Sequence, residues 1–174
     1  MPYDFRSDPI LGRAYEYWEG KCNGRVMPRR RDIEPSEITR LLPYLQINEF
    51  VDGGARIRYR LVGTGIVATQ GHDHTGKFLD EILSGSRRRY FEDCYRLMCR
   101  EKRPVLMSSR YFSRKDIELI SHRVALPLSE DAATVNQALV AMSFELPGES
   151  TSPMPGQWEK QDFDPSRASC EVIR

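Results

Sequence analysis

The sequence predicts an α+β fold built on an antiparallel sheet, and three observations lead to that prediction. Two strand-like segments are joined by Asp52-Gly53-Gly54, a tight-hairpin signal. Three more strand-like segments follow a helical stretch, with connections so short that only hairpins can join them. No helix stands singly between two strands, as the alternation of a parallel sheet would require. The chain has 174 residues, enough for one domain with extensions.

An N-terminal helix and a basic connector are predicted for residues 1–34. Asp8 and Pro9 precede an apolar stripe at helical spacing, and Gly20 is expected to end this helix. A short amphipathic helix is predicted for 35–42, where a proline terminates it. The main domain is therefore expected to cover residues 35–146.

The first two strands are predicted at Tyr44–Val51 and Ala55–Val62, because the glycines between them accept positive φ at no steric cost. In the second strand Ile57, Tyr59 and Leu61 alternate with three arginines. Since successive side chains of a strand point to opposite faces, one face of this strand is expected to be buried and the other solvated.

The rest of the chain divides into helices, strands and a tail. Helices are predicted for 63–70, 77–83 and 86–103, and strands for 105–112, 116–128 and 134–146. The remaining residues, 147–174, are rich in proline, serine and glycine and lack periodicity, so we expect a flexible tail.

A glycine-rich turn follows the second strand and is close to a dinucleotide-binding fingerprint, with Gly63, Gly65 and Ala68. A nucleotide fold needs a preceding strand that is buried on both faces, which the three arginines contradict. It also needs a longer helix than Gly71 permits. The glycines are therefore expected to form a sharp corner between a strand and a helix.

Two histidines, His72 and His74, could point at one metal ion if the backbone were extended between them. A metal site needs three or four ligands, and the sequence offers only His122 as a further histidine. We therefore predict a solvated turn in which Asp73 or Thr75 caps the next helix. A metal-binding protein that uses the three histidines is the less favoured alternative.

Several functional classes are disfavoured because the sequence lacks the motifs or the composition that they require. The sequence contains no G-x-S-x-G, H-E-x-x-H or phosphate-loop motif, so an enzyme is not predicted. The net charge of +1 gives no argument for nucleic acid, and Arg87-Arg88-Arg89 is expected on a solvated helix face. The apolar runs are shorter than the ~20 residues that cross a bilayer, so no membrane partner is expected. Four scattered cysteines and the lack of a secretion signal favour reduced thiols in the cytoplasm.

Several short motifs of the sequence resemble those of a divergent, chiefly alphaproteobacterial branch of the PAS sensory domains. They are Y-W, M-P-R-R-R-D-I-E-P, L-L-P-Y-L, Y-R-L-V-G-T and L-P-L-S-E-D, and the match covers nearly all of residues 11–144. The resemblance implies a PAS-like five-stranded antiparallel sheet with helices on one face and a small-molecule pocket between them. The photosensor cysteine motif of the flavin-binding members is absent, and the long helix lacks the histidine of the haem-binding members. Flavin and haem are therefore disfavoured, and the cofactor is unknown.

The pocket candidates are alternate residues on the inward-facing side of the predicted strands and apolar residues of the long helix. Most of them would also suit a plain hydrophobic core. The candidates are Tyr59, Leu61, Phe91, Tyr95, Met98, Met107, Ile120, His122, Val124, Val140 and Met142. His122 is the most informative of these, because an imidazole that faces inward needs a hydrogen-bond partner, such as a ligand or Tyr95.

The resemblance implies a non-catalytic sensory domain that binds a small molecule and signals through contact with a separate protein. A homodimer is expected through the helix at residues 9–19 and the exposed face of the sheet. The alternative is an interaction module without a ligand, which would use the tail beyond Leu146 or the arginine cluster.

Overall fold

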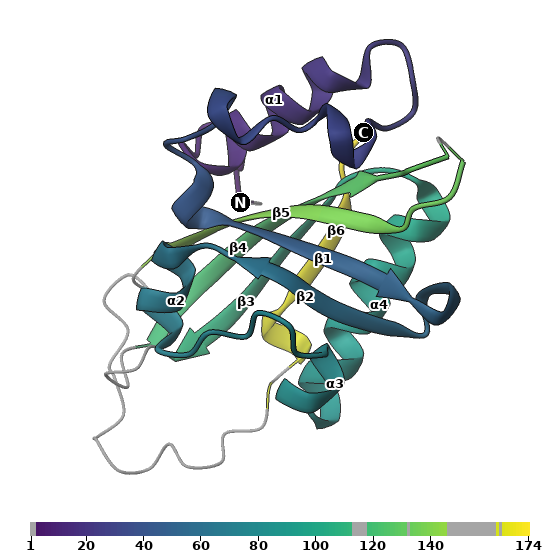
Figure 1. Cartoon of the computed structure of the whole chain (residues 1–174). Helices are drawn as coiled ribbons and strands as arrows, with labels where there is room; N and C mark the ends of the chain where they lie inside the picture. The colour runs from purple at the N-terminus through teal and green to yellow at the C-terminus, as the bar shows by residue number, and fades with distance from the viewer. Residues whose placement is uncertain (1–2, 113–117, 132, 146–162, 164) are drawn as a thin grey trace.

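The computed structural model describes residues 3–112, 118–131, 133–145, 163 and 165–174. Within them lies one antiparallel sheet of six strands in the order β2-β1-β5-β4-β3-β6 (Figure 1). The strands are β1 (Leu45–Val51), β2 (Arg56–Val62), β3 (Val105–Phe112), β4 (Glu118–Leu128), β5 (Gln137–Glu145) and β6 (Ser169–Val172). The predicted α+β fold with an antiparallel sheet is confirmed.

The sixth strand differs from the prediction of five strands followed by a flexible tail. β6 pairs with the edge of β3, from Val105 opposite Val172 to Ser108 opposite Ser169. Its four residues are too few to give a periodic signal, and the free edge of β3 supplies the backbone partners that form it. Residues 147–162 and 164 of the predicted tail lie outside the described residues.

Four α-helices are present in the described part of the chain: α1 (Leu11–Cys22), α2 (Thr64–Gln70), α3 (Leu79–Ile82) and α4 (Gly85–Glu101). Helix α1 continues through Gly20 and ends before Asn23, which adopts a left-handed conformation. The helix predicted for 35–42 is instead a 3-10 turn at Pro35–Glu37, followed by a second turn at Leu42–Tyr44. None of the described helices is long and apolar enough to cross a bilayer.

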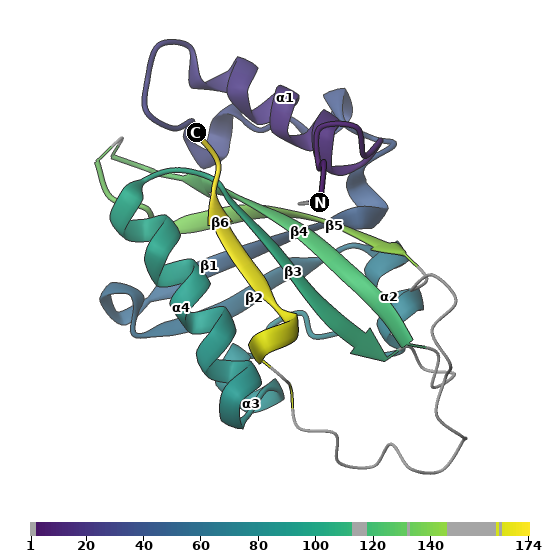
Figure 2. The ribbon, with the colours of Figure 1, turned by 180° about the vertical axis from the view of Figure 1, so that it is seen from behind.

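Helices of the PAS-like domain lie on one face of the sheet, as the resemblance implied, and the predicted N-terminal helix covers the other face. Helix α1 packs across β4 and β5, while α4 crosses the opposite face and contacts β3, β4 and β6 (Figures 1 and 2). We call the face that α1 covers the outer face and the face that α4 covers the inner face. The apolar stripe of α1 is buried, and Trp18 Nε1 donates a 2.8 Å hydrogen bond to the carbonyl oxygen of Pro127.

The arginine face of β2 is solvated, as predicted. The side chains of Arg56 and Arg58 are each 38% exposed and that of Arg60 is 57% exposed. A bulge then breaks the alternation, because Ile47 pairs with Leu61 while the next residue of β1 pairs with Tyr59. Arg60 is the extra residue, so Leu61 turns to the outer side and is 46% exposed.

The glycine turn is a corner of close backbone contact. Gly63 precedes α2, and a Cβ atom on it would lie 2.4 Å from the carbonyl oxygen of Pro43. Gly65 is less crowded, with the carbonyl oxygen of Pro43 again nearest, at 3.0 Å. The glycines therefore allow α2 to dock on the turn before β1.

Candidate functional site

A row of buried polar side chains crosses the inner face beneath α4. Gln46 Nε2 donates to Asn48 Oδ1 at 2.7 Å, and Asn48 Nδ2 donates to the Tyr95 hydroxyl at 2.6 Å. Burial raises the pKa of Tyr95, so its hydroxyl stays protonated. This row lies between two cavities on the inner side of the sheet, since Gln46 lines one and Tyr95 lines the other.

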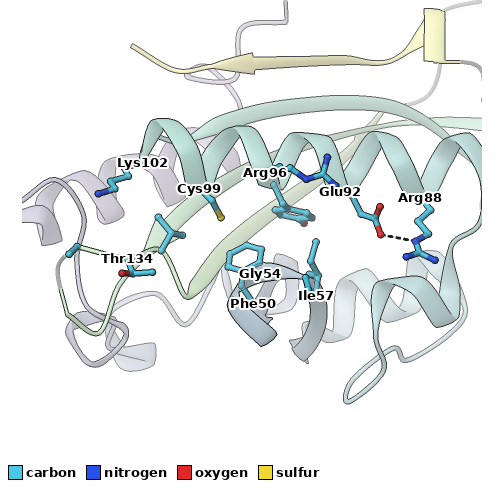
Figure 3. A pocket seen from close by; sticks show the side chains of 14 residues that line it. Phe50, Gly54, Ile57, Arg88, Glu92, Arg96, Cys99, Lys102 and Thr134 are labelled. Atoms are coloured by element: carbon cyan, nitrogen blue, oxygen red, sulfur yellow. Dashed lines mark hydrogen bonds and ion pairs between the residues drawn. The ribbon is translucent and has the colours of Figure 1, made fainter.

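The first cavity lies between α4 and the β1–β2 hairpin and has a volume of about 430 Å³ (Figure 3). We call it the hairpin cavity. Its apolar wall includes Phe50, Ile57 and Cys99, and charged side chains of α4 border it. Two of these charges neutralise each other, because Arg88 Nε lies 2.6 Å from Glu92 Oε1 (Figure 3). Burial raises the pKa of Cys99 to about 11, which keeps its sulfur an unreactive thiol.

The second cavity has a volume of about 280 Å³ and is lined by residues of the sheet and of α2, α3 and α4. We call it the arginine cavity. Its described lining residues are Gln46, Tyr59, Gln70, His72, His74, Ile82, Leu83, Arg87, Phe91 and Arg123. No aspartate or glutamate is among these described residues.

Arg123 is the most unusual of these residues. It lies in the central strand β4, is only 7% exposed, and stacks on Phe91, with Cζ 4.4 Å from the ring centroid. Its Nε atom is buried, and no residue in the described part of the chain accepts a hydrogen bond from it. Burial raises the pKa of Tyr59, and the positive charges of Arg123 and Arg87 partly oppose that rise.

The two neighbouring histidines form part of the cavity wall. The ring of His74 lies 6.2 Å from that of His72 and 6.0 Å from that of Tyr59. Burial lowers the pKa of His74, and the positive charges of Lys77 and His72 lower it further. His74 Nδ1 is buried without a hydrogen-bond partner among the described residues. The cavity therefore disfavours further positive charge.

In the turn that carries these histidines, Asp73 makes a hydrogen bond as predicted, but the bond does not cap the next helix. The carboxylate of Asp73 accepts a 2.8 Å hydrogen bond from the backbone of Thr75, within the turn itself. Helix α3 begins later, and Glu81 caps it by accepting from the backbone of Phe78 at 2.7 Å.

Three of the predicted pocket residues line one of the two cavities. Tyr59 and Phe91 line the arginine cavity, and Tyr95 lines the hairpin cavity. Four others are buried in the core without lining either cavity: Met98, Met107, Val140 and Met142.

Three predicted pocket residues of β4, Ile120, His122 and Val124, lie on the outer face. Arg123 contacts Phe91 of α4, and its strand neighbours must point the other way. His122 stacks instead on Tyr3 of the N-terminal segment, with ring centroids 3.5 Å apart. Leu61 is also outside both cavities, because of the bulge in β2.

The hydrogen-bond partner of His122 is Ser108, whose Oγ lies 2.7 Å from Nδ1, and not Tyr95. Its Nε2 lies 3.1 Å from Glu145 Oε1 but makes no hydrogen bond to a described residue. Since His122 is on the outer face and His72 lines a cavity on the inner side, the three histidines do not converge. No group of three histidine, cysteine or acidic residues in the described ranges is placed to hold a metal ion.

Besides the two histidines, the predicted pocket residues do not include six residues that line the arginine cavity: Gln46, Gln70, Ile82, Leu83, Arg87 and Arg123. A signal for Arg123 exists, because it is the single charged residue within Ile120–Leu128, an otherwise uncharged stretch that reads as a buried strand. Arg87 carries no such signal, since a run of three arginines at the start of a helix is equally typical of a solvated surface.

An antiparallel sheet with short helices, one long helix and a small cavity between them defines a domain of the α+β class. The comparison with known families agrees: the PAS domain model matches residues 7–143. The chain belongs to the PAS domain family, as the resemblance indicated. No curated protein matches the sequence significantly.

Proposed function

We propose that this protein is a non-catalytic sensory domain that binds a small molecule in the arginine cavity and signals through contact with another protein. The observation that carries the proposal is the buried Arg123 in the wall of this cavity, with an Nε atom that no described residue satisfies. Buried polar groups in proteins are almost always hydrogen-bonded, so a polar group left open in a cavity is typical of a binding site.

The position of the cavity supports a signalling role. A molecule bound there would touch α4 through Phe91, α3 through Ile82 and the sheet through Tyr59. These elements meet at the cavity, so binding would change how α4 packs on the sheet. The polar row from Gln46 to Tyr95 would carry such a change toward the hairpin cavity.

A homodimer stays part of the proposal, but on a different surface from the predicted one. The stripe of α1 is buried against its own sheet and is not free to contact a second copy. The large apolar side chains that remain exposed near the start of β1 and the end of β2 are Leu42, Tyr44 and Leu61. A contact between protomers would use this side of the sheet.

Native mass spectrometry of freshly purified protein tests the proposed function. We expect an adduct of small mass that disappears when the protein is denatured. Leu83→Phe, which adds volume to the wall of the cavity, should reduce the adduct, while the same change at exposed Leu42 should not. If the native protein carries no adduct, and no small molecule added back stabilises it, the chain is a ligand-free interaction module instead.

A further inference from the structure

Among the described residues, the charged side chains that line the arginine cavity are all basic. Arg87 and Arg123 line it together with His72 and His74, and its described lining contains no carboxylate. The combined positive field acts on the groups inside, since both arginines oppose the rise in the pKa of Tyr59. The cavity is therefore electrostatically suited to an anion.

Burial makes this charge costly in the absence of a ligand. An arginine cannot release its proton to avoid burial, as a lysine or histidine can. The stack of Arg123 on Phe91 satisfies the face of the guanidinium group, but its N–H donors point along the edge, where Nε has no acceptor in the described part of the chain. A carboxylate matches this edge best, because it accepts two parallel hydrogen bonds from a guanidinium group.

The rest of the wall limits the size and character of the ligand. The volume of about 280 Å³ corresponds to roughly nine water molecules at about 30 Å³ each, so a ligand of about that many non-hydrogen atoms would fill it. Ile82, Leu83 and Phe91 give one side of the cavity an apolar surface. Such a surface suits a carbon skeleton better than an inorganic ion.

Resting on the function proposed above, we propose that the ligand is a small organic acid whose carboxylate is bound by the edge of the Arg123 guanidinium group. Arg87 adds positive charge, and the body of the acid packs between Phe91 and the residues of α3. His74, through its free Nδ1, provides a further polar contact at the side of the loop.

Isothermal titration with matched probes tests the charge of the ligand. The probes are benzoate, succinate, inorganic phosphate and benzamide, which is the neutral analogue of benzoate. Protein that has been unfolded, dialysed and refolded is used, so that a retained ligand does not compete. We expect benzoate or succinate to bind and benzamide to bind at least tenfold more weakly, because the amide offers no negative charge to the arginine.

Substitutions locate the carboxylate. Arg123→Gln should weaken the binding of the acid about tenfold or more, and Arg87→Gln should also weaken it. Arg96→Gln is the matched control, because Arg96 lies on α4 with a side chain that is 70% exposed, and it borders the hairpin cavity. Circular dichroism identifies a variant that fails to fold, and Arg87→Gln keeps the test decisive if Arg123→Gln does so.

The outcomes separate this inference from the proposed function. Identification of the native adduct as a carboxylic acid supports the inference. A neutral adduct, equal binding of benzamide and benzoate, binding of phosphate alone, or unchanged affinity in the folded arginine variants would overturn it, while the sensory cavity would stand. If neither an adduct nor any probe binds, both proposals fail.

Discussion

Replacing Gly63 by alanine tests the contact that positions α2 and, with it, one wall of the arginine cavity. Gly63 has φ −65°, which any residue can adopt, so backbone conformation alone gives no penalty. The penalty is steric, because the new Cβ atom would lie 2.4 Å from the carbonyl oxygen of Pro43 and 2.5 Å from that of Leu42. Both neighbours are backbone atoms and cannot turn away as a side chain could.

The size of the effect follows from this geometry. Ordinary contacts of a Cβ atom begin at 3.4 Å, so the turn before β1 and the start of α2 must separate by about 1 Å. Overpacking typically costs about 1–3 kcal/mol, and we expect about 3 kcal/mol because the clash is with backbone on both sides. In a domain of this size each kcal/mol lowers Tm by about 2–4 °C, so Tm should fall by about 6–12 °C.

Urea unfolding followed by circular dichroism measures the change in stability. Gly20→Ala is the matched control, because Gly20 lies exposed in α1 with no atom within 4 Å of the added Cβ. That variant should be more stable than the unchanged protein by about 0.5–1 kcal/mol. If Gly63→Ala unfolds at the same urea concentration as the unchanged protein, the close approach described for this corner is wrong.

Three further predictions concern the stability of the folded protein, measured by urea unfolding for the first two and by Tm for the third. Trp18→Phe removes the hydrogen bond to Pro127 and should cost about 1–3 kcal/mol, while Trp18→Ala should cost about 3–5 kcal/mol; unchanged stability would contradict the docking of α1 on its own sheet. Tyr95→Phe leaves the buried amide of Asn48 without its acceptor and should cost about 1–3 kcal/mol, and a neutral effect would contradict the polar row. Because the pKa of His74 is lowered on folding, its charged form is disfavoured in the folded state. Stability from this group is complete above the unfolded pKa of about 6.5 and is lost as the pH falls through the folded value. Between about pH 7.5 and pH 5.5 the Tm of the unchanged protein should therefore fall further than that of His74→Gln, and parallel profiles would contradict the burial of His74.

The sequence alone determined the elements that rest on short-range rules. Glycine in the tight turn after β1 gave the hairpin, and the alternation around Tyr59 gave a strand with one solvated face, which excluded a parallel sheet. The apolar stripe of α1 was equally clear from its helical spacing. These features are set by neighbours a few residues apart, so a single sequence is enough to predict them.

Only the tertiary structure decided which side of each element faces the cavity. Periodicity separates His122 from Arg123 but does not say which of them meets α4, because that depends on helices distant in the chain. The bulge at Arg60 moves Leu61 to the outer side, and β6 exists because β3 offers a free edge. Backbone pairing and packing between segments remote in sequence fix these choices, and a local pattern contains no information about them.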